Sequence, residues 1–172
     1  MDVYYFTEMP YAEFPESEAE KFPSMRLTFP NTYFDPRLAG ELFRRYLDEY
    51  QYAEEVGFDG LMINEHHNTP SCMDVEVNIT GGILARITRR AKILILGNLL
   101  PTTDNPVRLA EEIAMVDVIS GGRLISGVVR GIGVLTSVLG IFPIVVGADE
   151  KTHVYTSRRM ISRNSWGTVQ TT

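Results

Sequence analysis

Apolar residues along the chain fall into short continuous runs, separated by longer stretches with helical periodicity. The runs are at residues 3–6, 60–63, 92–96 and 123–129. Runs of this length are typical of strands buried in a parallel sheet. Between them, apolar residues recur at spacings of three and four, as on one face of a helix. Helices are predicted over residues 35–57, 75–89 and 105–119.

The first predicted helix has the clearest boundaries. Asp35 is a residue type that caps helices, and Pro36 suits the first helical turn. Gly57 stands after the helix, where a left-handed conformation is needed. The apolar stripe of this helix consists of Leu38, Leu42, Tyr46, Tyr50 and Ala53. The apolar residues of the second helix are Val77, Ile79, Ile83, Leu84 and Ile87.

Residues 7–35 form the longest stretch without periodicity. They include four prolines, several aromatic residues and a group of acidic residues. Structureless segments of this length are uncommon in compact domains and often serve as lids over active sites. A lid and a plain surface insertion both fit the sequence.

Strands and helices alternate along the first 129 residues. This alternation predicts an α/β protein with a parallel sheet and helical crossovers. Two architectures have this order of elements: an open, doubly wound sheet and a closed (β/α)8 barrel of the TIM type. Periodicity alone does not choose between them.

The sequence changes character after Gly133. Residues 134–146 are apolar and β-branched, whereas residues 151–172 are polar and have no repeating apolar face. Residues 1–133 carry 12 basic and 20 acidic side chains, against four and two in the rest of the chain. We therefore expect a boundary near residue 133, followed by one further strand and then a poorly ordered tail over the remainder of residues 134–172.

Composition narrows the possible classes of function. The net charge of −6 argues against nucleic-acid binding, which needs a basic surface. The single cysteine, Cys72, excludes an internal disulfide framework, and we expect it to be inert. The N-terminus lacks the features of a secretory signal, and no apolar run reaches the roughly 20 residues of a membrane span. A cytoplasmic protein is the expectation.

The polar segment Glu65-His66-His67 directly follows the second predicted strand. Enzymes with parallel sheets keep their chemistry at the carboxyl ends of the strands. His66 could act there as a base or as a hydrogen-bond donor near neutral pH. A metal site is disfavoured, because zinc needs three or four converging ligands and adjacent histidines in an extended segment point in opposite directions. A purely structural pair of histidines also fits the pattern.

Two glycine-containing turns follow the later strands. Gly97 would let a flat ring approach the backbone after the third strand, and the Asn98 amide could hydrogen-bond the edge of that ring. Arg130 and Gly131 follow the fourth strand, where the guanidinium could bind a phosphate. The turn after the fourth strand lacks the full dinucleotide-binding fingerprint, and on its own an ordinary turn explains it better. An ordinary turn explains the Gly97 segment equally well.

Taken together, several segments resemble a known family. They are EHH at residues 65–67, LGNLLP at 96–101, NPVRLAEE at 105–112, SGGRL at 120–124 and RG at 130–131. In this order they resemble the luciferase-like monooxygenases, the bacterial luciferase superfamily of flavin-dependent oxidoreductases. The resemblance covers about residues 1–133 and implies the (β/α)8 barrel.

The resemblance also implies a cofactor and a reaction. The family uses reduced FMN, supplied by a separate flavin reductase, together with O2, to oxygenate a small organic substrate such as an aldehyde, alkane or sulfonate. Some branches use the deazaflavin F420 instead. By matched position, His66 is similar to the family's catalytic histidine at the reactive edge of the flavin. Glu65 and His67 flank it as substrate-binding residues.

Other residues match cofactor positions of the family. Gly97 and Asn98 fall in the segment beside the isoalloxazine ring. Arg130, followed by Gly131, matches an arginine near the flavin phosphate. Residues 7–35 match a segment that helps to shape the substrate pocket.

A complete barrel of this type needs about 250 residues, so we expect only its first four β/α units here. Half a barrel leaves two open strand edges and an uncovered apolar sheet face, which favours self-association. The leading hypothesis is a flavin-dependent monooxygenase that truncation impairs. The alternatives are a non-catalytic half-barrel module that pairs with another chain, and a metal-dependent hydrolase that uses His66 and His67.

Overall fold

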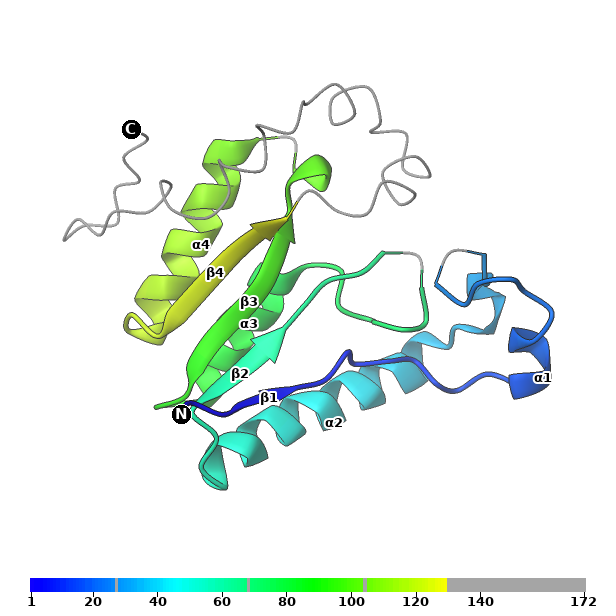
Figure 1. Cartoon of the computed structure of the whole chain (residues 1–172), viewed down its shortest axis with the longest axis horizontal. Helices are drawn as coiled ribbons and strands as arrows, with labels where there is room; N and C mark the ends of the chain where they lie inside the picture. The colour runs from blue at the N-terminus through cyan, green and yellow to red at the C-terminus, as the bar shows by residue number, and fades with distance from the viewer. Residues whose placement is uncertain (27, 68, 104, 130–172) are drawn as a thin grey trace.

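The computed structural model describes residues 1–129 except residues 27, 68 and 104. Its elements alternate as predicted (Figure 1). In chain order they are β1 (Tyr4–Phe6), α1 (Glu16–Ala19), the 3-10 helix η1 (Asn31–Tyr33), α2 (Pro36–Glu55), β2 (Gly60–Ile63), α3 (Val77–Ile87), β3 (Lys92–Leu99), the 3-10 helix η2 (Leu100–Thr102), α4 (Pro106–Ser120) and β4 (Leu124–Val129). Arg130, Gly131 and all that was predicted for residues 134–172 lie outside the described residues.

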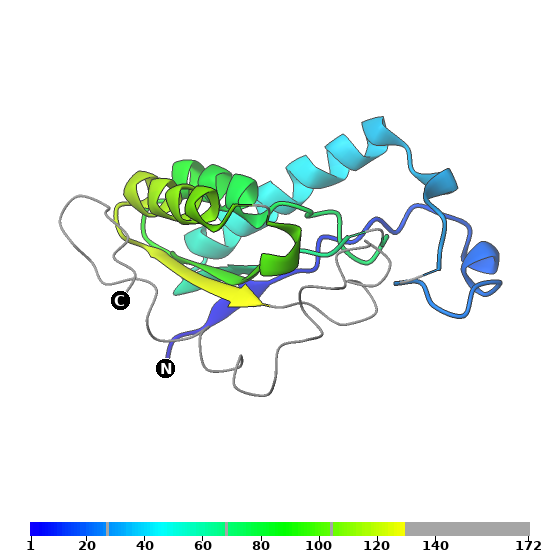
Figure 2. The same ribbon diagram turned by 90° about the horizontal axis from the view of Figure 1, so that it is seen from above.

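The four strands form one parallel sheet in the order β1-β2-β3-β4. Along one row of the sheet, Tyr5 is paired with Leu61, Leu61 with Ile93, and Ile93 with Leu124. Figure 2 shows that α2, α3 and α4 all lie on the same face of the sheet. The carboxyl ends of all four strands therefore meet at one edge, as they do in a TIM-type barrel. Within the described part of the chain, no helix is long and apolar enough to cross a membrane.

The core lies between the sheet and these helices. Leu61, Ile63, Ile93 and Ile95 alternate along β2 and β3 and are fully buried. Tyr50 of α2 is also fully buried and donates a hydrogen bond to the carbonyl of Met62 at 2.7 Å. Burial of these side chains stabilises the fold by about 1.5–3 kcal/mol each.

The opposite face of the sheet is apolar and partly open to solvent. Phe6, Leu96 and Ile125 are 40%, 39% and 42% exposed. In the sheet register Phe6 is paired with Met62, and Ile125 with Leu94. We refer to these five residues as the open sheet face. It corresponds to the uncovered apolar face that four strands were predicted to leave.

The helix boundaries follow the predicted capping signals. Asp35 accepts hydrogen bonds from the first backbone N–H groups of α2, and Asn105 does the same for α4. Gly57 has φ 101° and Gly121 has φ 70°, so both adopt the left-handed conformation just after a helix. The prediction that Asp35 and Gly57 delimit the first helix is confirmed.

Two apolar residues of α3 lie outside its buried face. Ile79 and Ile83 are 65% and 38% exposed, although the sequence grouped them with the apolar residues of this helix. Gly81 faces the core instead. A Cβ atom at Gly81 would lie 3.3 Å from the Ile95 side chain and 3.5 Å from that of Val116. Small residues thus let α3 approach the sheet and α4 closely, which turns the larger isoleucines outward.

Residues 7–35 are more ordered than their irregular sequence predicted. The segment contains α1, η1 and a cluster of aromatic rings. The ring of Phe29 lies 4.8 Å from that of Phe14, 5.4 Å from that of Phe22 and 5.7 Å from that of Tyr33, centroid to centroid. Phe29 is 8% exposed, so the segment has a small apolar core of its own.

Two charged residues fix the turn between α3 and β3, far from the carboxyl ends of the strands. The Glu54 carboxylate accepts hydrogen bonds from the backbone N–H groups of residues 89–91, at 2.6–3.1 Å. Burial alone would raise the pKa of Glu54, but these donors outweigh it and lower the pKa. Arg123 donates to the carbonyls of Ala85, Thr88 and Ala91. The arginine of the SGGRL segment therefore stabilises the fold.

Candidate functional site

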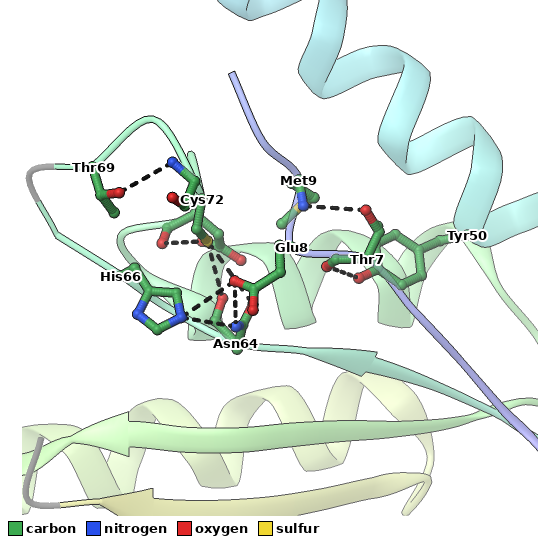
Figure 3. Close-up of polar contacts among 10 residues, drawn as sticks. Thr7, Glu8, Met9, Tyr50, Asn64, His66, Thr69 and Cys72 are labelled. Atoms are coloured by element: carbon green, nitrogen blue, oxygen red, sulfur yellow. Dashed lines mark hydrogen bonds and ion pairs between the residues drawn. The ribbon is translucent and has the colours of Figure 1, made fainter. Parts of the chain in front are cut away.

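The segments after β1 and β2 bring Glu8, Asn64 and His66 together at the carboxyl edge of the sheet (Figure 3). His66 Nε2 lies 3.1 Å from Asn64 Nδ2 and 3.3 Å from Glu8 Oε2. Asn64 Nδ2 also donates a hydrogen bond to Glu8 Oε2 at 3.0 Å. The side chains of His66 and Glu8 remain 23% and 38% exposed, so a ligand could reach them. We refer to these three residues as the Glu8–Asn64–His66 cluster.

Backbone hydrogen bonds hold this cluster in place. The N–H of Met73 donates to the carbonyl of Met9, and the N–H of His66 donates to the carbonyl of Asp74, both at 3.0 Å. Met9 is fully buried and has φ 46°, a left-handed conformation that costs a non-glycine residue about 1 kcal/mol or more. The segment that carries Glu8 is therefore fixed against the segment that follows His66.

His66 is held mainly in its neutral form at pH 7. Burial lowers its pKa below the usual value, and the positive charges of Arg26 and of a protonated His67 act in the same direction. Glu8 and Glu65 oppose this by favouring the charged ring. A neutral imidazole can accept a proton at one nitrogen and donate a hydrogen bond from the other, as a general base requires.

His67 has a separate partner and the opposite shift. Its Nε2 lies 3.1 Å from Glu65 Oε1, and this hydrogen bond raises the pKa of His67. The two adjacent rings therefore belong to different contacts, as predicted for neighbours in an extended segment. Glu65 joins His67 and is not part of the Glu8–Asn64–His66 cluster.

A pocket of about 280 Å³ lies between the carboxyl ends of β2 and β3 and the start of α4. Glu65, Glu76, Glu112 and Arg108 supply its charged lining. Among the described residues, no group of three His, Cys, Asp or Glu side chains is arranged to hold a metal ion. The metal-dependent hydrolase hypothesis therefore has no ligand set in this part of the chain.

Strand β3 runs through Gly97 to Leu99, whereas the sequence predicted a turn after residue 96. The register with β4 shifts between Ile95 and Asn98, which marks a bulge. A Cβ atom at Gly97 would collide with the side chain of Val129. The packing of β4 against β3 thus already requires a glycine at this position, and its role beside a flavin stays a prediction.

Asn98 is 2% exposed and turned toward β4. Its Nδ2 donates to Ser126 Oγ and to the carbonyl of Gly127, both at 3.1 Å. These side-chain hydrogen bonds of Asn98 join β3 to β4 where the bulge interrupts the backbone hydrogen bonds. Asn98 also lines the pocket described above, and whether it contacts a cofactor stays a prediction.

Cys72 lies beside the cluster but is not reactive. It is 1% exposed, and burial raises its pKa to about 12. Because the thiolate is the nucleophilic form, a thiol of this kind is inert near neutral pH. The sequence predicted inertness from a lack of basic neighbours, and burial is the stronger reason.

Glu8 and Asn64 were not among the predicted site residues. Both stand just after a strand, as His66 does, so the rule that selected His66 could have selected them. Glu8 also needed the knowledge that β1 pairs with β2, which brings two segments 56 residues apart into contact. No local pattern in the sequence carries that information.

Comparison with known proteins identifies the family. The family model described as "Luciferase-like monooxygenase" matches residues 27–139. The chain belongs to this family. It is 31% identical over 107 residues to the alkanal monooxygenase beta chain of Vibrio harveyi, and 35% identical over 99 residues to the alpha chain from Photobacterium leiognathi. These matches cover 62% and 54% of this luciferase-like chain, but only 32% and 26% of the two relatives.

Two solved structures share the fold of this luciferase-like chain. One is the oxygenating constituent of 3,6-diketocamphane monooxygenase from Pseudomonas putida in complex with FMN, with a TM-score of 0.58 and 20% identity. The other is the monooxygenase RslO1 from Streptomyces bottropensis, with a TM-score of 0.59 and 23% identity. The matches cover 81% and 84% of this chain and 32% and 37% of those chains. The predicted fold class, part of a TIM-type barrel, is confirmed.

The buried carboxyl of Asp74, whose backbone holds His66, gives a testable pH dependence. Asp74 is 2% exposed, its Oδ2 has no hydrogen-bond partner within the described residues, and burial raises its pKa to about 6. A raised carboxyl pKa stabilises the folded state below the unfolded pKa near 4, and this contribution is lost as the pH rises through 6. At pH 7.5 the buried charge costs about 3 kcal/mol.

Urea unfolding of an Asp74→Asn variant between pH 4.5 and pH 7.5 would measure this cost. We expect the free energy of unfolding of the variant, relative to the unsubstituted chain, to rise by about 2 kcal/mol across this range. Asp48→Asn, at an exposed position on α2, is the control and should show a flat difference. A flat difference for Asp74→Asn as well would contradict the raised pKa.

Proposed function

We propose that this chain forms one wall of the flavin site of a luciferase-like monooxygenase, with His66 as its catalytic residue. The observation that carries the proposal is the Glu8–Asn64–His66 cluster at the carboxyl edge of the sheet. Family membership supports a flavin reaction, and a relative of the same fold is described in complex with FMN. The chain spans about a quarter to a third of the length of these relatives, so the rest of the site would come from elsewhere.

The residues at this edge fit a flat, partly apolar cofactor. In the second half of β3, the open sheet face offers the partly exposed side chain of Leu96 for contact with a ring system, and His66 offers a polar group at the carboxyl edge. Reduced FMN, supplied by a separate reductase, would provide with O2 the oxygenating chemistry for a small organic substrate. Gly97 and Asn98 would contact the ring segment, and Arg130 with Gly131 the phosphate. F420 is the alternative cofactor.

The chain's own residues have distinct roles in this proposal. His66, neutral at pH 7, accepts or donates a proton at the reacting group. His67 and Glu65, joined by their hydrogen bond, contact the polar part of the substrate. The aromatic cluster around Phe29 holds residues 7–35 as a wall that excludes water from the substrate.

Flavin binding by the purified chain tests the proposal. Fluorescence titration with FMN, and anaerobically with reduced FMN, should give saturable binding in the micromolar range. Leu96→Glu should weaken binding at least about tenfold, because it places a carboxylate on the open sheet face. Val118→Glu, at a residue 73% exposed on α4, is the matched control and should bind normally.

Absence of binding at high micromolar concentrations of both FMN and F420 would rule out a flavin site in this chain. Equal loss of affinity in Leu96→Glu and Val118→Glu would mean that the open sheet face is not the binding surface.

A second candidate function is a non-catalytic module that completes its barrel with another chain. The open sheet face favours it, because Phe6, Leu96 and Ile125 place partly exposed apolar side chains on one face of the sheet. Within the described sheet, β1 and β4 each have one unpaired edge. Two copies could close both edges with parallel pairing and cover both open faces, and this makes self-association the expected state.

Sedimentation velocity at several protein concentrations tests this second function. We expect the unsubstituted chain to be a dimer. Ile125→Lys, on the open sheet face, should raise the dissociation constant of this dimer at least about tenfold. Val118→Lys, on the helical face, should leave the dimer intact. A monomer with a cooperative thermal transition, or dissociation by Val118→Lys alone, would contradict pairing through the sheet.

A further inference from the structure

The position of Asn64 determines where His66 carries its hydrogen. Asn64 Nδ2 lies within hydrogen-bond distance of both Glu8 Oε2, at 3.0 Å, and His66 Nε2, at 3.1 Å (Figure 3). An ionised carboxylate only accepts hydrogen bonds, so the NH2 group is the end of the amide that faces Glu8. The same NH2 group can only donate to His66, so Nε2 accepts and the hydrogen of the neutral ring is on Nδ1.

Glu8 has a different effect on the same nitrogen. Its Oε2 lies 3.3 Å from His66 Nε2, close enough for the carboxylate to stabilise a proton on that nitrogen. When the ring becomes charged, Nε2–H can donate to Glu8, and the opposite charge favours the protonated form. Among the described residues, the other charged or titratable groups that act on the ring are Arg26, His67 and Glu65.

The geometry is held by contacts that do not involve the ring. The N–H of Tyr11 donates to the carbonyl of Pro70 at 2.7 Å, and Met73 N–H to the carbonyl of Met9 at 3.0 Å. These bonds join the segment that carries Glu8 to the segment that follows His66. The left-handed backbone of Met9, φ 46°, is a local cost of setting Glu8 at this position.

We propose that Glu8 and Asn64 are positioning residues that decide which nitrogen of His66 carries a proton. Asn64 holds the neutral ring with its hydrogen on Nδ1, and Glu8 accepts a hydrogen bond from Nε2 when the ring is charged. Within the described residues His66 Nδ1 has no hydrogen-bond partner, so its hydrogen is available to a ligand. The importance of this proton placement for catalysis rests on the proposed role of His66 in the flavin reaction, whereas the placement itself follows from the contacts above.

Nuclear magnetic resonance of the imidazole nitrogens tests the proposal without a cofactor. The 15N-labelled chain is titrated from pH 5 to pH 8.5, and the Nδ1 and Nε2 shifts are followed by long-range proton–nitrogen correlation. The chain has three histidines, so a His66→Gln variant identifies the His66 signals. At high pH we expect the hydrogen on Nδ1, which is the tautomer that an isolated histidine favours less. The Nε2–H tautomer in the unsubstituted chain would overturn the role of Asn64.

Two substitutions should move the titration in opposite directions. Glu8→Gln removes the opposite charge and should lower the midpoint of the His66 titration by about half a pH unit or more. Asn64→Asp supplies a group that only accepts, so it should raise the midpoint and move the hydrogen of the neutral ring to Nε2. Glu13→Gln removes one exposed carboxylate from the same segment as Glu8 and is the matched control.

Backbone amide spectra of each variant check that it is folded. Glu8 is 38% exposed on its side chain, so Glu8→Gln keeps the test available even if Asn64→Asp does not fold. Equal midpoints for Glu8→Gln and Glu13→Gln would overturn the role of Glu8. These signals are read in the absence of flavin, so failure of the chain to bind FMN would contradict the proposed function and leave this proposal standing.

Discussion

Packing of α2, α3 and α4 on a single face of the parallel sheet is the constraint on which the rest of the structure depends. Each crossover returns the chain to the same end of the sheet, so the carboxyl ends of the strands share one edge. The same packing buries Leu61, Ile63 and Ile93 while it leaves Phe6, Leu96 and Ile125 partly exposed. One arrangement thus produces both the polar edge and the open sheet face beside it.

The two neighbouring histidines at this edge differ in their partners and in the direction of their pKa shifts. Burial lowers the pKa of His66, whereas the hydrogen bond to Glu65 raises the pKa of His67. Adjacent groups with opposite shifts are a recurring feature of sites that transfer protons. At the other end of the sheet, Glu54 and Arg123 bind backbone groups, and Arg123 also donates to the Thr88 hydroxyl; these hydrogen bonds stabilise the turn before β3. A stabilising amino edge opposite a carboxyl edge that carries the proposed site is the division expected of a TIM-type barrel.

Much of the fold could be predicted from local signals. Strand runs, the Asp35 cap and Gly57 each depend on neighbours in sequence, and the structure agrees with them. The buried face of α3 could not be predicted, because it depends on how closely Gly81 lets the helix approach Ile95. The order within residues 7–35 could not be predicted either, because an aromatic cluster that spans 20 residues has no periodicity in the sequence.

The candidate site was only half predictable for the same reason. His66 stands in a recognisable segment after a strand, but Glu8 reaches it only through the pairing of β1 with β2. The residue type of Asn98 indicates a candidate site residue, but its contacts to β4 come from a bulge that no sequence pattern predicts. The sequence motifs predict which segments lie at the carboxyl edge of the sheet. The partners of each side chain at that edge depend on tertiary contacts.

The most direct test of the central claim is a map of amide shifts in the 15N-labelled chain as FMN is added. The largest changes should cluster at the carboxyl edge and the open sheet face, including Phe6, Leu96 and His66. Exposed residues on the opposite side of the molecule, such as Ile79 and Val118, should not move. Changes centred on α3 and α4, or small changes spread over the whole chain, would contradict a flavin site at this edge.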